Sequence, residues 1–398
     1  MKILVVAPYY VPYTSGMTVY LQRLVEGLAK DNEVTILTAQ HDKNLPMREI
    51  VRGVDVIRTP VAFTLQRGAF SPSLIFRFMR IVGKYDVVNI HAPFFEAGLI
   101  GLMTRIFGRK YVLTYICDLR MLGSSLSIPG MIEHLYYFSV KFAAWSSEKV
   151  VVLSKDYMES SRLKGFAHKS VAIIPPIDTE KFKKVADVSA FENSYGINKE
   201  DVVIGFLGRL THEKGVEYLI SAAPRILERS PSARIVVAGE GENVAGGLNE
   251  SVKAKLEGQA KSLGLGDKVV FTGYLDEASV LEFYSRCDVF VLPSIDPLEA
   301  FGMVQVEAML CGTPVVATDM PGIREAIRLT GYGRLVPPKD SEKLAAAIID
   351  VLNKRGKFNV PREKIVELFS AEKTVAEYEK VFEMIYLSSS LRGIPFPR

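Results

Sequence analysis

The chain has 398 residues, of which 48% are hydrophobic and 24% charged; this excludes a disordered or fibrous protein and suits two domains. The net charge is only +4, but residues 1–180 hold 21 Lys and Arg against 15 Asp and Glu, so the first half carries +6 and the remainder −2. We therefore expect the first half to face any anionic surface or acceptor, and we expect no nucleic-acid partner.

The cysteines and the hydropathy of the chain indicate the cellular compartment in which the protein would be found. Cys117, Cys287 and Cys311 follow no metal-ligand spacing, which indicates a reducing environment without a disulfide framework. The first residues resemble a buried strand rather than a signal peptide, and no segment approaches the roughly 18 uncharged apolar residues of a membrane span. We expect a cytoplasmic protein, with a peripheral position at the inner membrane face as an alternative.

Short runs of Val, Ile and Leu alternate with helical stretches along the whole chain. Such runs are typical of buried parallel strands, and their alternation with helices predicts doubly wound α/β layers. Two prolines at 175–176, followed by polar residues, indicate a linker between two series of runs. The expected strands are residues 3–7, 34–38, 87–90, 111–114, 150–153 and 171–174, then 202–207, 234–238, 269–272, 289–292 and 314–317.

In the first series, Ser15 and Gly16 open an amphipathic helix that runs to residue 28, and Gly16 can supply a positive φ or a close backbone approach. Segments 70–84 and 121–145 combine basic with apolar side chains. Either segment is a candidate contact with an anionic membrane, although the pattern also fits a core helix with one solvated face.

Two cations follow the first strand of the second series. Arg209 and Lys214 lie in a loop that ends near Gly215, where a helix begins. Fixed positive charge beside the amides of a helix N-terminus suits a pyrophosphate group. Two solvated loop cations are the alternative interpretation.

Two carboxylates flank the loop after strand 289–292. Glu299 lies in the loop, and Glu307 lies near the start of a helix that opens near Gly302. Small ligands bind at strand–loop–helix junctions of α/β proteins, where the helix offers free N–H groups to an anion. The pair suits a ligand with hydroxyls on both sides of a phosphate, such as a sugar nucleotide, although the spacing alone also fits a solvated helix.

These blocks together resemble the retaining glycosyltransferases of family 4, which have the GT-B fold. The resemblance rests on Gly-Arg-Leu at 208–210 with Lys214, and on Glu-x7-Glu from Glu299 to Glu307 around Ala-Phe-Gly at 300–302. It implies an α/β protein with two Rossmann-like doubly wound domains facing a central cleft. Residues 1–178, completed by a C-terminal helix at 371–398, would form the acceptor side, and residues 179–370 would bind the nucleotide-sugar donor.

The resemblance also implies roles for single residues. Arg209 and Lys214 would neutralise the leaving nucleoside diphosphate, while Glu299 would contact the transferred sugar and Glu307 the ribose. Backbone amides in the loop at 301–302 would hold the pyrophosphate, which makes Phe301 and Gly302 donor-binding candidates.

Two positions depart from the family pattern. The family usually has Gly-Gly where this chain has Ser15-Gly16, which leaves Gly16 as the donor-binding candidate of that loop. Many members have a His where this chain has Ile116. We therefore expect Asp118 to take a catalytic part, with His91 and Ile116 as acceptor-side candidates.

The sequence contains no Asp-x-Asp pattern, which the metal-dependent class of transferases would use to hold Mg²⁺ or Mn²⁺. We expect neither a metal nor another cofactor, the nucleotide sugar being a substrate. The predicted activity is retaining, metal-independent transfer of a hexose to an acceptor hydroxyl. A non-catalytic GT-B nucleotide-binding partner protein and a sugar-nucleotide epimerase are the alternatives. The nucleotide, the sugar and the acceptor (glycan, lipid or small molecule) stay open.

Overall fold

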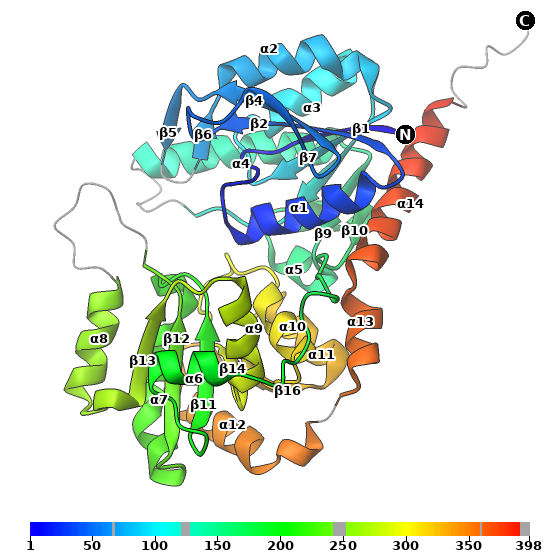
Figure 1. The fold of residues 1–398 in the computed structure, drawn as a ribbon. Helices are drawn as coiled ribbons and strands as arrows, with labels where there is room; N and C mark the ends of the chain where they lie inside the picture. Colours follow the sequence, from blue (N-terminus) through cyan, green and yellow to red (C-terminus); the bar gives the residue numbers. More distant parts are fainter. Residues whose placement is uncertain (66–67, 121–127, 242–251, 359, 391–398) are drawn as a thin grey trace, which may run out of the picture. The chain divides into compact units, whose positions relative to one another are not determined.

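The computed structural model describes residues 1–65, 68–120, 128–241, 252–358 and 360–390. The chain divides into two compact units (Figure 1). Unit 1 consists of Met1–Pro176 with Ala371–Arg398, and unit 2 of Ile177–Ser370. Parts of two predicted segments, residues 121–127 and 391–398, lie outside the described residues.

The sheet of unit 1 has eight strands among the described residues, in the order β10-β9-β8-β7-β1-β2-β4-β3. All neighbours pair in parallel except the edge strand β3, which is antiparallel to β4. The chain therefore winds outward from the middle in two directions, and the order reverses between β1 and β7. The strands are β1 (Lys2–Val6), β2 (Glu33–Gln40), β3 (Arg48–Val51), β4 (Val54–Pro60), β7 (Val87–Ala92), β8 (Tyr111–Tyr115), β9 (Lys149–Val152) and β10 (Ser170–Ala172), with a separate hairpin of β5 (Phe63–Leu65) and β6 (Gly68–Phe70).

Helices cover this sheet, and local sequence explains where the first one begins. The Ser15 hydroxyl accepts a hydrogen bond from the Thr18 N–H (3.2 Å), and the Thr18 hydroxyl accepts one from the Ser15 N–H (2.8 Å). This reciprocal cap explains a serine where the family usually has glycine. The helices of unit 1 are α1 (Gly16–Leu28), α2 (Pro72–Ile81), α3 (Ala97–Ile106), α4 (Ile128–Ser146), α5 (Lys155–Ser160) and α14 (Ala371–Ser390), with 3₁₀ turns η1 (Val82–Lys84) and η2 (Lys164–Lys169).

The C-terminal helix α14 is part of unit 1 through buried polar contacts. The hydroxyls of Tyr20 on α1 and Tyr378 on α14 lie 2.6 Å apart, and the Tyr378 hydroxyl lies 3.1 Å from that of Thr114 in β8. Buried hydroxyls are expensive to leave unpaired, so this chain of three fixes the position of α14 against α1 and the sheet.

Unit 2 contains a fully parallel sheet of six strands among the described residues, in the order β13-β12-β11-β14-β15-β16. Numbered along the chain, this is the 3-2-1-4-5-6 order of dinucleotide-binding folds. The strands are β11 (Val202–Leu207), β12 (Ala233–Ala238), β13 (Val269–Gly273), β14 (Val289–Leu292), β15 (Val315–Thr318) and β16 (Gly333–Val336). The helices are α6 (Ser189–Tyr195), α7 (Val216–Arg229), α8 (Val252–Ser262), α9 (Glu277–Arg286), α10 (Met303–Leu310), α11 (Ile323–Thr330), α12 (Ser341–Asn353) and α13 (Arg362–Phe369), with 3₁₀ turns η3 (His212–Lys214), η4 (Gly266–Lys268) and η5 (Arg355–Lys357).

The prediction of two Rossmann-like doubly wound domains is confirmed, and each of the predicted strands lies in one of the two sheets. Three strands of the main sheets that the hydropathy pattern did not indicate are β3, β4 and β16. β4 was missed because Asp55, Arg58 and Thr59 interrupt its apolar run, although Arg58 is buried and paired with Glu49.

Candidate functional site

The candidate site of unit 2 lies where the strand order of its sheet reverses, between β11 and β14. These strands are adjacent, with Ile204 opposite Val289, so the loops at their carboxyl ends meet. The Ile295 N–H of the second loop donates to the Glu213 carbonyl of the first (3.0 Å). A side chain at Gly215 would lie 2.2 Å from the Pro293 carbonyl oxygen. Two motifs far apart in sequence are therefore packed against each other at the usual ligand-binding point of such sheets.

An ion pair joins the two loops. Lys214 Nζ donates to Glu299 Oε2, and the two side chains are only 18% and 17% exposed. With water largely excluded, such a pair interacts more strongly than one on an open surface. The sequence assigned Lys214 to the diphosphate and Glu299 to the sugar; the structure brings the two side chains into direct contact. Arg209 lies in the same loop as Lys214 and is exposed.

Helix α10 begins directly after the Glu299 loop. Its N-cap, Gly302, has a φ of 74°, and a Cβ there would lie 2.4 Å from Leu292 Cδ2, so only glycine fits. The first N–H groups of an α-helix lack helical acceptors and carry its partial positive charge; in α10 the Gln305 N–H is already bonded to the Gly302 carbonyl (3.1 Å), which leaves Met303 and Val304 as the candidate donors to a ligand. The Phe301 side chain is buried against Phe369, with ring centroids 6.2 Å apart. A donor-binding role for Phe301 would therefore involve its backbone.

Glu307 lies one turn into α10 rather than at the helix start, because the helix begins only at Met303. It is buried and accepts a hydrogen bond from the Tyr284 hydroxyl (3.1 Å). Burial, followed by the charge of Glu307, raises the pKa of Tyr284 well above its usual value. Tyr284 therefore stays a protonated donor that orients the Glu307 carboxylate.

Tyr284 and Gln305 are the positioning residues that sequence reasoning missed. The Gln305 side-chain amide donates to the carbonyls of Phe301 (2.6 Å) and Ile323 (2.9 Å), which ties the Gly302 turn to α11. Glu307, which accepts from Tyr284, lies 23 residues further along the chain. The bonds from Tyr284 to Glu307 and from Gln305 to Ile323 have no local sequence signal, since each depends on which helices are neighbours in space.

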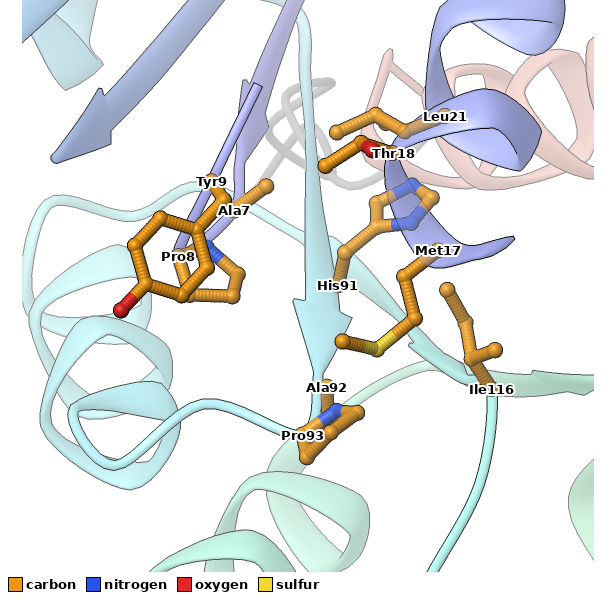
Figure 2. A pocket seen from close by; sticks show the side chains of 10 residues that line it. All are labelled: Ala7, Pro8, Tyr9, Met17, Thr18, Leu21, His91, Ala92, Pro93 and Ile116. Carbon is orange, nitrogen blue, oxygen red and sulfur yellow. The ribbon is translucent and has the colours of Figure 1, made fainter. Parts of the chain in front are cut away.

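In unit 1, His91 and Ile116 line one small cavity of about 20 Å³ at the point where that sheet also reverses, between β1 and β7 (Figure 2). The loop after β1 and the first turn of α1 close its other sides (Figure 2). The cavity is lined by Ala7, Pro8, Tyr9, Met17, Thr18, Leu21, His91, Ala92, Pro93 and Ile116. Two predicted acceptor-side residues thus lie together, at the ends of neighbouring strands.

His91 is the last residue but one of β7, and it is 2% exposed. Neither ring nitrogen has a hydrogen-bond partner among the described residues. Burial lowers the pKa of His91 from 6.5 to about 3, so the imidazole is neutral at physiological pH. Its contact with a ligand stays a prediction.

Gly16 and Asp118 are also placed differently from expectation. Gly16 is the first residue of α1 and its φ is not positive, since Ser15 caps the helix; the alternative, a close approach of its backbone to a donor, stays a prediction. Asp118 Oδ1 accepts hydrogen bonds from the Tyr115 hydroxyl and from the Arg162 N–H (3.1 Å). The carboxylate therefore fixes the loop after β8, and its catalytic role stays a prediction.

Over the described ranges, no three His, Cys, Asp or Glu side chains are grouped as ligands for a metal ion. The helices in the same ranges are all too short or too polar to cross a membrane.

Two protein families match the chain. The family described as "Glycosyl transferase 4-like domain" matches residues 15–176, and "Glycosyl transferases group 1" matches residues 187–367. An uncharacterized glycosyltransferase of Methanocaldococcus jannaschii is 31% identical over 413 residues, which cover 97% of this chain and 100% of the relative. The phosphatidyl-myo-inositol mannosyltransferase of Mycobacterium leprae is 25% identical, with 98% of each chain covered.

Solved structures share the fold. Sucrose-phosphate synthase from Thermosynechococcus elongatus has a TM-score of 0.77 at 22% identity, covering 97% of this chain and 99% of its own. Anabaena HepE in complex with UDP and glucose has a TM-score of 0.74 at 19% identity, covering 96% and 99%. Identities this low establish a common architecture and no shared substrate.

The burial of His91 predicts a pH dependence of stability. Its pKa is about 3 in the folded chain and near 6.5 when unfolded, so between these values only the unfolded state takes up the proton. Stability should therefore fall as the pH drops below 6.5, by at most about 1.4 kcal/mol per pH unit from this residue. Denaturant unfolding of His91→Met should show a shallower slope of stability against pH than the wild type. The exposed His168→Gln should keep the wild-type slope; equal slopes in all three proteins would contradict the assignment.

Proposed function

The chain belongs to the glycosyltransferases of the family 4 type and has their GT-B fold, and we propose that it transfers a hexose from a nucleoside-diphosphate sugar to an acceptor hydroxyl. We further propose that the reaction retains the configuration of the anomeric carbon and needs no metal ion. Unit 2 would hold the donor.

The observation that carries this proposal is the Lys214–Glu299 ion pair at the switch point of unit 2. A cation, a carboxylate and the N-terminus of α10 lie within two adjoining loops. A nucleotide sugar carries a diphosphate next to sugar hydroxyls, so the cation and helix amides match the first and the carboxylate matches the second. Binding would exchange part of the ion pair for contacts with the donor.

The step that most needs stabilisation is the departure of the nucleoside diphosphate. The bond from the anomeric carbon to the diphosphate oxygen breaks, the bond to the acceptor oxygen forms, and the acceptor proton leaves with the diphosphate. Negative charge therefore accumulates on the diphosphate as the bond lengthens. Lys214, Arg209 and the α10 amides would stabilise that charge, and preorganised charge of this kind is usually the largest contribution to catalysis.

Each carboxylate would have its own task. Glu299 is held by Lys214, which suits it to accept hydrogen bonds from sugar hydroxyls rather than to attack the anomeric carbon. Retention would then follow from attack and departure on the same face of the sugar, the route usually described for the family. Glu307, oriented by Tyr284, would accept from the ribose hydroxyls.

Metal independence is proposed from the residues present. The chain lacks the Asp-x-Asp pattern, and Arg209 and Lys214 supply positive charge where a divalent ion would otherwise bridge the diphosphate. Unit 1 would bind the acceptor, and His91 and Ile116 would line its small cavity rather than donate or accept protons.

The pyrophosphate assignment can be tested by replacing Arg209 or Lys214 with Ala. Each change should weaken nucleoside diphosphate binding by roughly 1.5–3 kcal/mol, as expected for loss of a charge-assisted hydrogen bond. Isothermal titration calorimetry measures this, with Lys343→Ala, an exposed cation on α12, as the matched control. Wild-type affinity in both Arg209→Ala and Lys214→Ala would rule the assignment out.

Substitutions of Glu299 and Glu307 should change different kinetic and binding constants. Glu299→Gln should lower kcat without weakening nucleoside diphosphate binding, since it removes the carboxylate proposed to contact the sugar and leaves Lys214 available to the diphosphate. Glu307→Gln keeps an acceptor for Tyr284 yet should weaken nucleotide binding. Thermal unfolding of both variants controls for damage to the fold. Equal loss of nucleotide affinity in the two variants would mean that the division of labour is wrong.

The donor can be found by thermal shift against a panel of nucleotide sugars. A donor present at about one hundred times its Kd should stabilise the chain by roughly 2.7 kcal/mol. Transfer from that donor should then persist in EDTA. Loss of transfer in EDTA with recovery on adding Mg²⁺ or Mn²⁺ would refute metal independence, and interconversion of the sugar without an acceptor would identify an epimerase instead.

A further inference from the structure

Two neighbouring helices of unit 1 expose an unusual number of large apolar side chains. On α4 the exposed residues repeat at intervals of three, four or seven positions, which places them on one outward face. Leu135, Phe138 and Trp145 are 67%, 71% and 66% exposed. The full set comprises Leu99, Leu102 and Ile106 of α3, Phe107 directly after it, and Met131, Leu135, Phe138 and Trp145 of α4. We call these eight residues the α3–α4 surface.

The inward side of α4 is apolar as well. Tyr136, Val140 and Ala143 are buried against the rest of unit 1, so the helix already has the core-facing stripe that the fold requires. A helix that is apolar on both sides normally has a second apolar environment. Contiguous exposed apolar patches are rare on soluble proteins and mark surfaces of interaction.

The two helices form one continuous surface because they are in close contact. A Cβ at Gly98 of α3 would lie 2.6 Å from the Ser139 carbonyl oxygen of α4, and the Gly98 N–H donates to the Ser139 hydroxyl (3.0 Å). Helix α3 connects the parallel strands β7 and β8, and α4 connects β8 and β9, so the two crossovers step in the same direction along the sheet, and such crossovers are almost always right-handed. The two helices therefore cover the same face of it.

The charges around the α3–α4 surface are mainly positive. Two carboxylates near it are in ion pairs, Glu133 with Arg162 (3.4 Å) and Glu148 with Arg105 (2.7 Å). Lys141 lies on the exposed stripe of α4 between Phe138 and Trp145, and it has no ion-pair partner in the part of the chain that the structure describes. An ammonium group among exposed apolar side chains can reach phosphate headgroups while its stem stays in an apolar layer.

Helix α2, which packs beside α3, adds further positive charge. A groove of about 510 Å³ next to it is lined by Arg48, Arg58, Arg77 and Arg80. Arg48 and Arg58 are paired with Asp55 and Glu49, whereas neither Arg77 nor Arg80 has an ion-pair partner within the described residues. The helical layer α2–α4 therefore combines exposed apolar groups with uncompensated cations.

We propose that the α3–α4 surface docks on an anionic lipid bilayer, with Leu135, Phe138 and Trp145 entering the interface and Lys141 contacting the headgroups. Charge complementarity favours this occupant, because a second copy of the chain would bring the same cations together across a two-fold axis. The prediction of a membrane contact through segments 70–84 and 121–145 is thereby narrowed to named side chains, and α3 is added to it.

Vesicle co-sedimentation of the full chain tests the proposal independently of any transfer activity. The wild type should bind vesicles of phosphatidylcholine with about one-third phosphatidylglycerol and should bind pure phosphatidylcholine more weakly. The double change Leu135→Gln/Phe138→Gln should weaken binding to the anionic vesicles by about tenfold or more. Lys141→Gln should weaken it by about fivefold, the effect of one lysine at such a surface.

The matched control is Met384→Gln/Leu387→Gln on α14, which removes two exposed apolar side chains from another helix of unit 1 and should leave vesicle binding unchanged. Circular dichroism melting checks that every variant is folded. The proposal is overturned if the wild type binds neither vesicle, if it binds both equally, or if the α4 double variant binds like the wild type. A dimer in light scattering that the α4 double variant converts to a monomer would instead assign the surface to a protein contact.

Discussion

The adjacency of β11 and β14 is the constraint on which the candidate donor site depends. Because the chain of unit 2 winds outward from β11 in both directions, the loops after these strands share one edge of the sheet. Only this arrangement lets Lys214 reach Glu299. The packing of Gly215 on the Pro293 carbonyl and the turn at Gly302 then set the entry of both following helices. Charge, carboxylate and helix amides are therefore presented by loops that are in close backbone contact.

The two sheets use the same topological position in different ways. In unit 2 the switch point carries an ion pair that is partly accessible to solvent. In unit 1 it is lined mainly by apolar side chains around a neutral imidazole. A transfer reaction needs fixed positive charge only where the leaving group accumulates negative charge. The contrast is consistent with a donor held by unit 2 and with a less charged role for the interior of unit 1.

Not every apolar residue in the helices of unit 1 is explained by packing against the core. α1 and α14 join through buried tyrosine hydroxyls, and α3 and α4 join through the contact of Gly98 with Ser139. The outward apolar stripe of α4 adds nothing to either contact. Such a stripe reduces solubility, so it is expected to persist where something covers it. The sequence predicted a basic and apolar character for this region but could not tell its inward from its outward side.

The sequence alone determined most strands of the two sheets, the order of the loops and the residue types in them. This was possible because Val and Ile runs, glycines and caps such as Ser15 act within a few residues of chain. Tertiary structure decided the rest: that Lys214 pairs with Glu299, that Tyr284 orients Glu307, and that His91 lies inside the core. Each of these depends on which elements are neighbours in space. A local sequence pattern does not specify which elements become neighbours. Strand order and helix packing result from burying all the apolar faces of a unit together.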